Sequence, residues 1–152
     1  MKKKTIVCIL ISAVIFISGI SATCWATEQS AISNAAGVIQ ALNQKTGGII
    51  NWRTKPSDIK SLFLHTGEEY IYSNYFYAGN TYFILAVGCD DATDLDVTLY
   101  DENGNVVSSD TTTKSWSVVT INPKWTGKFY IKVKMYKAVG GAAHAIMLTG
   151  FI

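Results

Sequence analysis

An alternating run in the middle of the chain constrains the fold most strongly. From Asp94 to Tyr100 the sequence reads DLDVTLY, so Leu95, Val97 and Leu99 fall on one side of an extended chain and polar side chains on the other. Successive side chains of a β-strand point to opposite faces of the sheet. The run therefore predicts a strand that buries its aliphatic side chains and exposes its carboxylates.

The residues after this strand predict a tight turn. Asp101 to Asn105 reads DENGN. An Asp side chain can accept a hydrogen bond from the backbone two residues further on, and Gly104 adopts a positive φ without steric cost. A second strand follows at Val106, so we expect a hairpin in an antiparallel sheet with one solvated face.

Similar short runs, separated by turns, continue from Ser61 to the end of the chain. The run Thr81–Val87 is apolar without clean alternation, which predicts a central strand. Seven or eight such strands predict an all-β fold, a jelly-roll-like antiparallel β-sandwich. The expected strands are Leu62–His65, Glu68–Tyr77, Thr81–Val87, Asp94–Asp101, Val106–Ser109, Ser115–Ile121, Lys128–Tyr136 and Ala142–Thr149.

A helix is expected before the strands, over Thr27–Lys45. Thr27 or Ser30 can cap its start, and the pair Gly47–Gly48 can end it. Its apolar side chains recur at three- and four-residue spacing, which predicts a stripe that packs on the sandwich or its edge. The stripe comprises Ala31, Ile32, Ala35, Ala36, Ile39 and Leu42. Residues 48–60 are expected to form a connector.

The first 26 residues have the layout of a secretory signal peptide. Three lysines at positions 2–4 precede the apolar run Ile6–Ile20, and small residues follow. We expect cleavage after Ala26, with Ala22 as the alternative; an uncleaved anchor and lipid attachment at Cys24 are weaker readings. The expected organisation is a signal peptide (1–26), a helix with connector (27–60) and a sandwich (61–152), exported to the periplasm or the medium.

Removal of the signal peptide changes the charge. Three of the 13 Lys and Arg residues leave with it, and the remaining ten face 11 Asp and Glu residues, a net charge of −1. This balance gives no support to nucleic-acid binding. No Lys or Arg occurs between Lys60 and Lys114, where nine acidic residues lie, seven of them between Asp90 and Asp110, and five lysines follow Pro123. We therefore expect an acidic side and a basic strand.

One cysteine remains in the predicted sandwich. Cys89 is expected to be a small buried hydrophobic residue. The alternatives are a disulfide with Cys24, if cleavage follows Ala22, or a disulfide with another chain.

Three segments together resemble the bacterial pre-peptidase C-terminal domain family. They are AGNTY at 78–82, DLDVTLYDENGN at 94–105, and Pro123 followed by TGKFYIKV at 126–133. The family pattern reads AGxxY, DLDLxxYDxxGN, P and TGxYxIxV in this order, and the match covers residues 61–152. The chain resembles short, freestanding exported members more than members that are appended to enzymes.

This resemblance implies a jelly-roll-like β-sandwich that serves as a non-catalytic accessory or binding module. Relatives in collagenases bind collagen and calcium, with calcium ligands largely in an acidic segment before the sandwich. Here Glu28 and Asp58 are the only acidic residues of the segment 27–60, so this chain departs from that pattern.

Calcium is the only cofactor that the sequence suggests. Four aspartates could converge at the entrance of the strand Asp94–Asp101: Asp90, Asp91, Asp94 and Asp96. Ca²⁺ takes six to eight oxygen ligands, carboxylates among them. The alternative is a solvated acidic loop that caps turns and protects a sheet edge.

A binding surface is expected on the strand Lys128–Tyr136. Tyr130, Lys132, Lys134 and Tyr136 alternate with apolar residues and share its outward face. Tyrosine combines apolar area with a polar group, which suits a hydrated interface. We expect an extracytoplasmic protein or polysaccharide as the partner.

Enzymatic activity is not expected. No nucleophile elbow or zinc-protease motif occurs in the sequence. The rival hypothesis is a small hydrolase built around His65 or His144, and a third is a structural subunit whose copies associate through the helix or a sheet edge.

Overall fold

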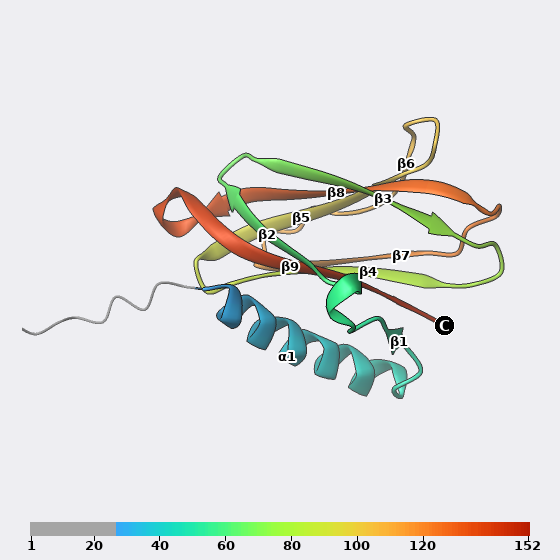
Figure 1. The fold of residues 1–152 in the computed structure, drawn as a ribbon, viewed down its shortest axis with the longest axis horizontal. Coiled ribbons are helices and arrows are strands. Elements are labelled where there is room, and N and C mark those ends of the chain that lie inside the picture. The colour runs from blue at the N-terminus through green and yellow to red at the C-terminus, as the bar shows by residue number, and fades with distance from the viewer. Residues whose placement is uncertain (1–26) are drawn as a thin grey trace, which may run out of the picture.

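The computed structural model describes residues 27–152, so the predicted signal peptide lies outside the described residues. Two antiparallel sheets pack face to face, and one helix covers the outer side of one of them (Figure 1). This confirms the predicted β-sandwich with an N-terminal helix. The described residues form nine strands, one more than the upper expected number.

The helix α1 spans Glu28–Thr46. The Thr27 side chain accepts a hydrogen bond from the backbone N–H of Ser30, and Gly47 ends the helix with φ of 69°. Ala31 and Ala35 are buried against β4 and β9, so the helix packs on the sandwich as predicted. The predicted stripe was wrong in part, because Ile32 and Ala36 are exposed. Val38, which was not assigned to the stripe, packs against the core instead.

The sheet beneath the helix has five strands. β9 is its centre and pairs with β4 on one side and with β2 and β1 on the other, while β7 extends the sheet beyond β4. The prediction of residues 48–60 as a connector missed β1, a two-residue strand with too little sequence to show a period. The bounds are β1 Asn51–Trp52, β2 Lys60–His65, β4 Tyr82–Gly88, β7 Trp116–Ile121 and β9 Ala142–Phe151. A short 3₁₀ helix, Pro56–Asp58, links β1 and β2.

The second sheet has four strands in the order β3-β8-β5-β6. Its outer side faces away from the helix, in the upper part of Figure 1. Every predicted strand has its counterpart, with ends shifted by one or two residues. The bounds are β3 Glu69–Phe76, β5 Ala92–Tyr100, β6 Val106–Asp110 and β8 Gly127–Ala138.

The core lies between the sheets. Leu95, Val97 and Leu99 are fully buried, as the alternating run predicts. β4 and β9 are buried on both faces, because the sandwich covers one face and α1 the other. This double burial explains why β4 reads as an apolar run. Cys89 is also fully buried and has no disulfide partner among residues 27–152, which confirms its expected burial as a small hydrophobic residue; the alternative pairing with Cys24 lies outside the described residues.

The turn after β5 forms as the sequence predicts. The Oδ1 atom of Asp101 accepts hydrogen bonds from the backbone N–H of Asn103 (2.9 Å) and of Asn105 (2.8 Å). Gly104 adopts φ of 82°. The hairpin between β5 and β6 carries a register shift at Leu99/Tyr100.

Candidate functional site

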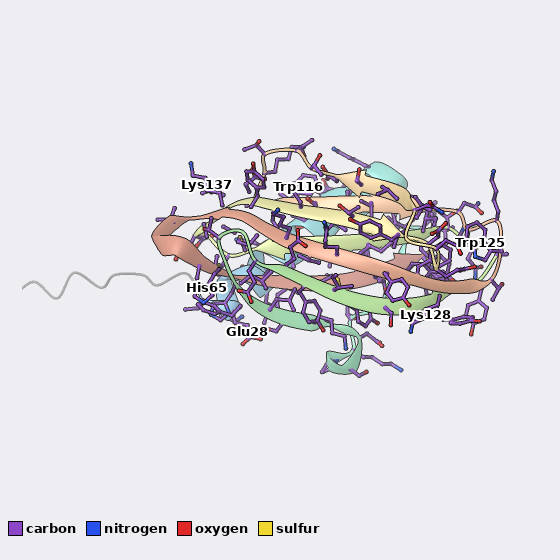
Figure 2. The ribbon with its side chains drawn as sticks, turned by 90° about the horizontal axis from the view of Figure 1, so that it is seen from above. Glu28, His65, Trp116, Trp125, Lys128 and Lys137 are labelled. Carbon is purple, nitrogen blue, oxygen red and sulfur yellow. The ribbon has the colours of Figure 1, made fainter. Side chains whose placement is uncertain are left out.

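The outer side of the four-stranded sheet displays an ordered set of polar and aromatic side chains, which we call the open face. Cross-strand neighbours share a face, so the register of β3, β8 and β5 defines its rows. The rows are Glu69–Lys134–Asp96, Ile71–Lys132–Thr98, Ser73–Tyr130–Tyr100 and Tyr75–Lys128. Tyr136 lies next on β8. Figure 2 looks down on this face, with Lys128 toward one end and Lys137 toward the other.

Lysines on the open face lie over tyrosine rings. The Nζ atom of Lys128 is 5.3 Å from the ring centroid of Tyr130, and the Nζ atom of Lys134 is 5.6 Å from that of Tyr136. Lys132 lies over the ring of Tyr100, also at 5.6 Å. Ammonium groups within about 6 Å of an aromatic face are attracted by the negative charge of the π-system. The lysines thus cover one side of each ring.

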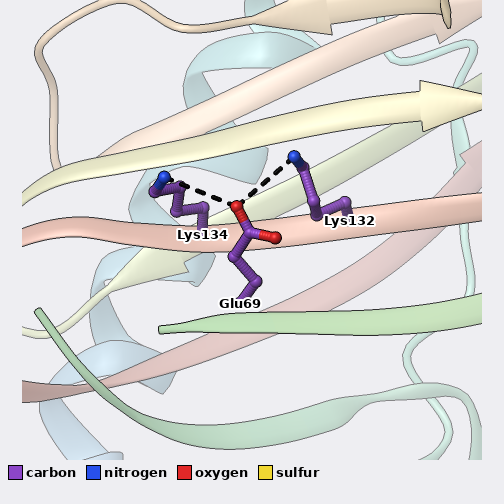
Figure 3. A network of polar contacts seen from close by, with 3 residues as sticks. All are labelled: Glu69, Lys132 and Lys134. Atoms are coloured by element: carbon purple, nitrogen blue, oxygen red, sulfur yellow. Dashed lines mark ion pairs between the residues drawn. The ribbon is translucent and has the colours of Figure 1, made fainter. Parts of the chain in front are cut away.

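Glu69 joins two of these lysines across the strands. Its Oε1 atom lies 3.4 Å from the Nζ atoms of both Lys132 and Lys134 (Figure 3). Desolvation would raise the pKa of the Glu69 carboxyl, but the hydrogen bonds and charges of the two lysines outweigh it and lower the pKa. The open face therefore holds a carboxylate between two cations where β3 begins.

Large apolar groups are exposed elsewhere on the open face. Ile71 is 61% exposed, Tyr136 58% and Tyr75 55%. Five clefts of the described residues lie elsewhere, and no residue of the open face lines any of them. The open face is thus flat and amphipathic. Such a surface suits another macromolecule better than a small ligand, which binds in concave sites.

The structure brings together the four residues of the predicted binding surface. Tyr130, Lys132, Lys134 and Tyr136 all point outward from β8, although only Tyr136 is strongly exposed. Sequence reasoning missed the contribution of β3. The local sequence does not indicate that β3 and β8 pair, because about fifty residues separate the two strands. Binding through these residues stays a prediction.

The four aspartates of the predicted calcium site do not converge. Asp90 and Asp91 lie in the turn between β4 and β5, where the Oδ1 atom of Asp90 accepts a hydrogen bond from Asn34. Asp94 and Asp96 lie on β5 beside the lysines of β8. Over residues 27–152, no three His, Cys, Asp or Glu residues are grouped so as to hold a metal ion. Calcium binding itself stays a prediction.

The carboxylates of β5 were expected to be exposed. This prediction was wrong for Asp94, whose exposed fraction is only 8%. β5 changes register on both sides of Asp94, and Lys137 and Lys134 of β8 lie opposite Asp94 and Asp96. The Oδ1 atoms of both aspartates are buried without a hydrogen-bond partner. Burial, and then the charges of Asp94 and Asp110, raise the pKa of Asp96.

The two histidines lie elsewhere, on the outer side of the five-stranded sheet. Their rings flank that of Phe63, with centroids 5.8 Å away for His65 and 4.8 Å for His144. Within the described residues, neither imidazole takes part in a hydrogen bond, and the Cys89 thiol is fully buried. The structure therefore does not assemble a nucleophile and base around His65 or His144.

Comparisons with known proteins give similarity at the level of the fold. No family model and no curated protein matches the chain. A crystal structure of PliG from Aeromonas hydrophila, a periplasmic inhibitor of g-type lysozyme, shares 13% identity over 62% of this chain and 84% of its own, with a TM-score of 0.46. A pre-peptidase C-terminal domain of collagenase from Bacillus anthracis shares 14% identity over 59% and 87%, with a TM-score of 0.45.

Proposed function

We propose that this protein is a non-catalytic binding module that acts outside the cytoplasm and contacts another protein through the open face. The observation that carries this proposal is the asymmetry of the two sheets. α1 covers the outer side of the five-stranded sheet, whereas the open face has no covering element among residues 27–152. Exposed Ile71, Tyr75 and Tyr136 remain there in contact with water.

The chemistry of the open face favours a protein over a polysaccharide. A sugar ring binds by stacking on a free aromatic face, but one face of Tyr100, Tyr130 and Tyr136 lies under a lysine ammonium group. A protein surface can instead supply carboxylates for the lysines and apolar side chains for Ile71. Tyrosine-rich, amphipathic patches are typical of the centres of protein–protein interfaces.

Export is the second part of the proposal. It rests on the predicted signal peptide, which lies outside the described residues. Over residues 27–152, no helix has the length and hydrophobicity that a membrane span requires. We infer that cleavage would release the sandwich with its helix to the periplasm or the medium.

The proposal is tested by pull-down from the native envelope or medium with residues 27–152 as bait. Tyr136→Glu places a charge at the most exposed aromatic group of β8, and Ile49→Glu is the matched control at an exposed apolar residue after α1. We expect a protein that the wild type and the control retain and that Tyr136→Glu loses. Retention of polysaccharide after protease treatment of the extract, or equal retention by Tyr136→Glu, would overturn the proposal.

A further inference from the structure

The edges of the two sheets differ in how they are protected. A strand at a sheet edge has unpaired backbone groups, and natural proteins block such edges with charges, bulges, prolines or very short strands. The edge strands here are β3 and β6 in one sheet, and β7 with the pair β1 and β2 in the other.

Three of these edges have a blocking device. On β7, the backbone N–H of Val118 donates to the Oδ2 atom of Asp110 (3.1 Å). On β2, the N–H of His65 donates to the Oε2 atom of Glu68 (2.8 Å), and β1 has only two residues. β6 is five residues long and carries a register shift against β5.

β3 lacks these devices over most of its length. It is eight residues long, reads EYIYSNYF without Lys, Arg, Pro or Gly, and pairs with β8 in one unbroken register. One outward N–H, that of Tyr75, has an acceptor in the side chain of Asn74 (2.9 Å). Figure 2 shows β3 at the margin of the four-stranded sheet.

The backbone groups of Ile71 and Ser73 point away from the sheet. The N–H of Met135 donates to the carbonyl of Glu68 directly before β3. In an antiparallel ladder every second residue bonds to the same neighbour. Tyr70, Tyr72 and Asn74 therefore bond to β8, and the residues between them offer their N–H and C=O groups to a further strand.

Opposite charges that are incompletely paired lie near the two ends of β3: Glu69 on β3 itself, and Lys128 on the neighbouring strand β8. At one end both lysine contacts of Glu69 use Oε1, so Oε2 has no ion-pair partner in residues 27–152. At the other end Lys128 lies opposite Tyr75 and has no carboxylate partner in the same part of the chain. An antiparallel copy of β3 would bring each acidic end beside the basic end of its partner.

We propose that β3 pairs antiparallel with β3 of a second copy of this chain. The two four-stranded sheets then join into one continuous sheet around a two-fold axis, and the strand pairing is the same from both sides. Ile71 and Tyr75 of each copy gain neighbours from the partner's strand beside them, while their outward sides and Tyr136 stay free on the open face. The dimer presents two open faces side by side, which raises the avidity for a partner that offers two sites.

Light scattering during size exclusion of residues 27–152, over a wide concentration range, tests this proposal. Ser73→Pro removes an outward N–H on an edge strand, where proline is tolerated. We expect it to weaken the dimer roughly thirtyfold, because symmetry places the change twice and each lost bond corresponds to about fivefold. Ile71→Lys, a surface change that keeps the backbone, should also weaken it, and so should Lys128→Glu, which meets Glu69 of the partner.

Tyr136→Lys is the matched control, because it adds a charge to the same face but away from the edge. It should leave the dimer unchanged. A monomer at every concentration, or a dimer that all three edge variants leave intact, would overturn the proposal. Because Ser73→Pro does not alter Tyr136, loss of the dimer with retention of a partner protein separates this inference from the proposed function.

Discussion

At the scale of single residues, two aspartates have opposite electrostatic roles. Asp101 accepts hydrogen bonds from the side chain of Asn105 and from the backbone of the turn, and these bonds lower its pKa below the ordinary value of 3.8. Asp96 is partly buried near Asp94 and Asp110, and its pKa is raised above 3.8. Ionisation of Asp101 therefore stabilises the folded state, whereas ionisation of Asp96 destabilises it.

Asp101→Asn should lower the Tm at neutral pH, because the amide retains only one of the two accepting oxygens. The stabilisation by the carboxylate is fully present above pH 3.8 and is lost as the pH falls through the lowered folded-state pKa. Thermal unfolding followed by circular dichroism should show a Tm difference that shrinks in strongly acidic buffer. An equal difference at neutral and strongly acidic pH would contradict this role.

Asp96→Asn should raise the Tm at neutral pH. The penalty for the charged carboxylate is absent below pH 3.8 and grows as the pH rises through the raised folded-state pKa. The gain in Tm should therefore disappear in acid, the reverse of the pH dependence for Asp101→Asn. Asp58→Asn, at a half-buried residue of the connector, is the control. A lower Tm of Asp96→Asn than of the wild type at neutral pH would contradict this prediction and would show that the Asp96 carboxylate makes a favourable interaction.

At the scale of secondary-structure elements, β1 and the connector close one end of the five-stranded sheet against Gly150. A Cβ atom at Gly150 would lie 2.7 Å from Cγ2 of Ile50 and 2.9 Å from Cε3 of Trp52. The absence of a side chain in β9 at this point lets Trp52 pack on the sheet. Trp52 in turn donates a hydrogen bond from Nε1 to Asn43 at the end of α1 (3.0 Å).

Gly150→Ala should thus destabilise the protein by about 1–3 kcal/mol, the usual cost of overpacking. Gly37→Ala in α1 is the matched substitution, because no atom lies within 4 Å of its added Cβ. It should stabilise the protein by about 0.5–1 kcal/mol through helix propensity. Denaturant unfolding of both variants checks the pair. Equal effects would contradict the packing of β1 and Trp52 on β9.

The helix and most strands could be predicted from the local sequence pattern, whereas the pairing of one strand with another could not. Short alternating or apolar runs between turns placed eight strands, and the DENGN turn was correct down to the hydrogen bond of Asp101. β1 escaped prediction because two residues carry no period. The pairing of β3 with β8 depends on contacts across the whole sandwich, and so the sequence could not assign Glu69 and Ile71 to the site.

At the scale of the whole molecule, α1 creates the difference between a covered and an open sheet. The apolar run of β4 predicts burial on both faces but does not say what covers it. The burial of Asp94 also depends on the folded molecule, because its cross-strand neighbour, Lys137, belongs to a strand about forty residues further along the chain. The open face could therefore be predicted as one strand, Tyr130 to Tyr136, but not as a surface.

Removal of divalent cations should leave the fold unchanged. Asp94 and Asp96 have lysines opposite them, and the described residues contain no grouped set of three metal-binding side chains. Melting with and without EDTA, after purification in calcium, should therefore give the same Tm. A lower Tm with EDTA would show that calcium stabilises the sandwich.

The central claim is that the open face meets another protein. Site-specific photo-crosslinking in the native cells tests it most directly, with the photoreactive residue at Tyr136 and, as a control, at Ile49, which lies after α1. We predict a discrete protein adduct from Tyr136 and none from Ile49. Adducts from Ile49 with none from Tyr136 would contradict the claim and would move the interface to the helix side.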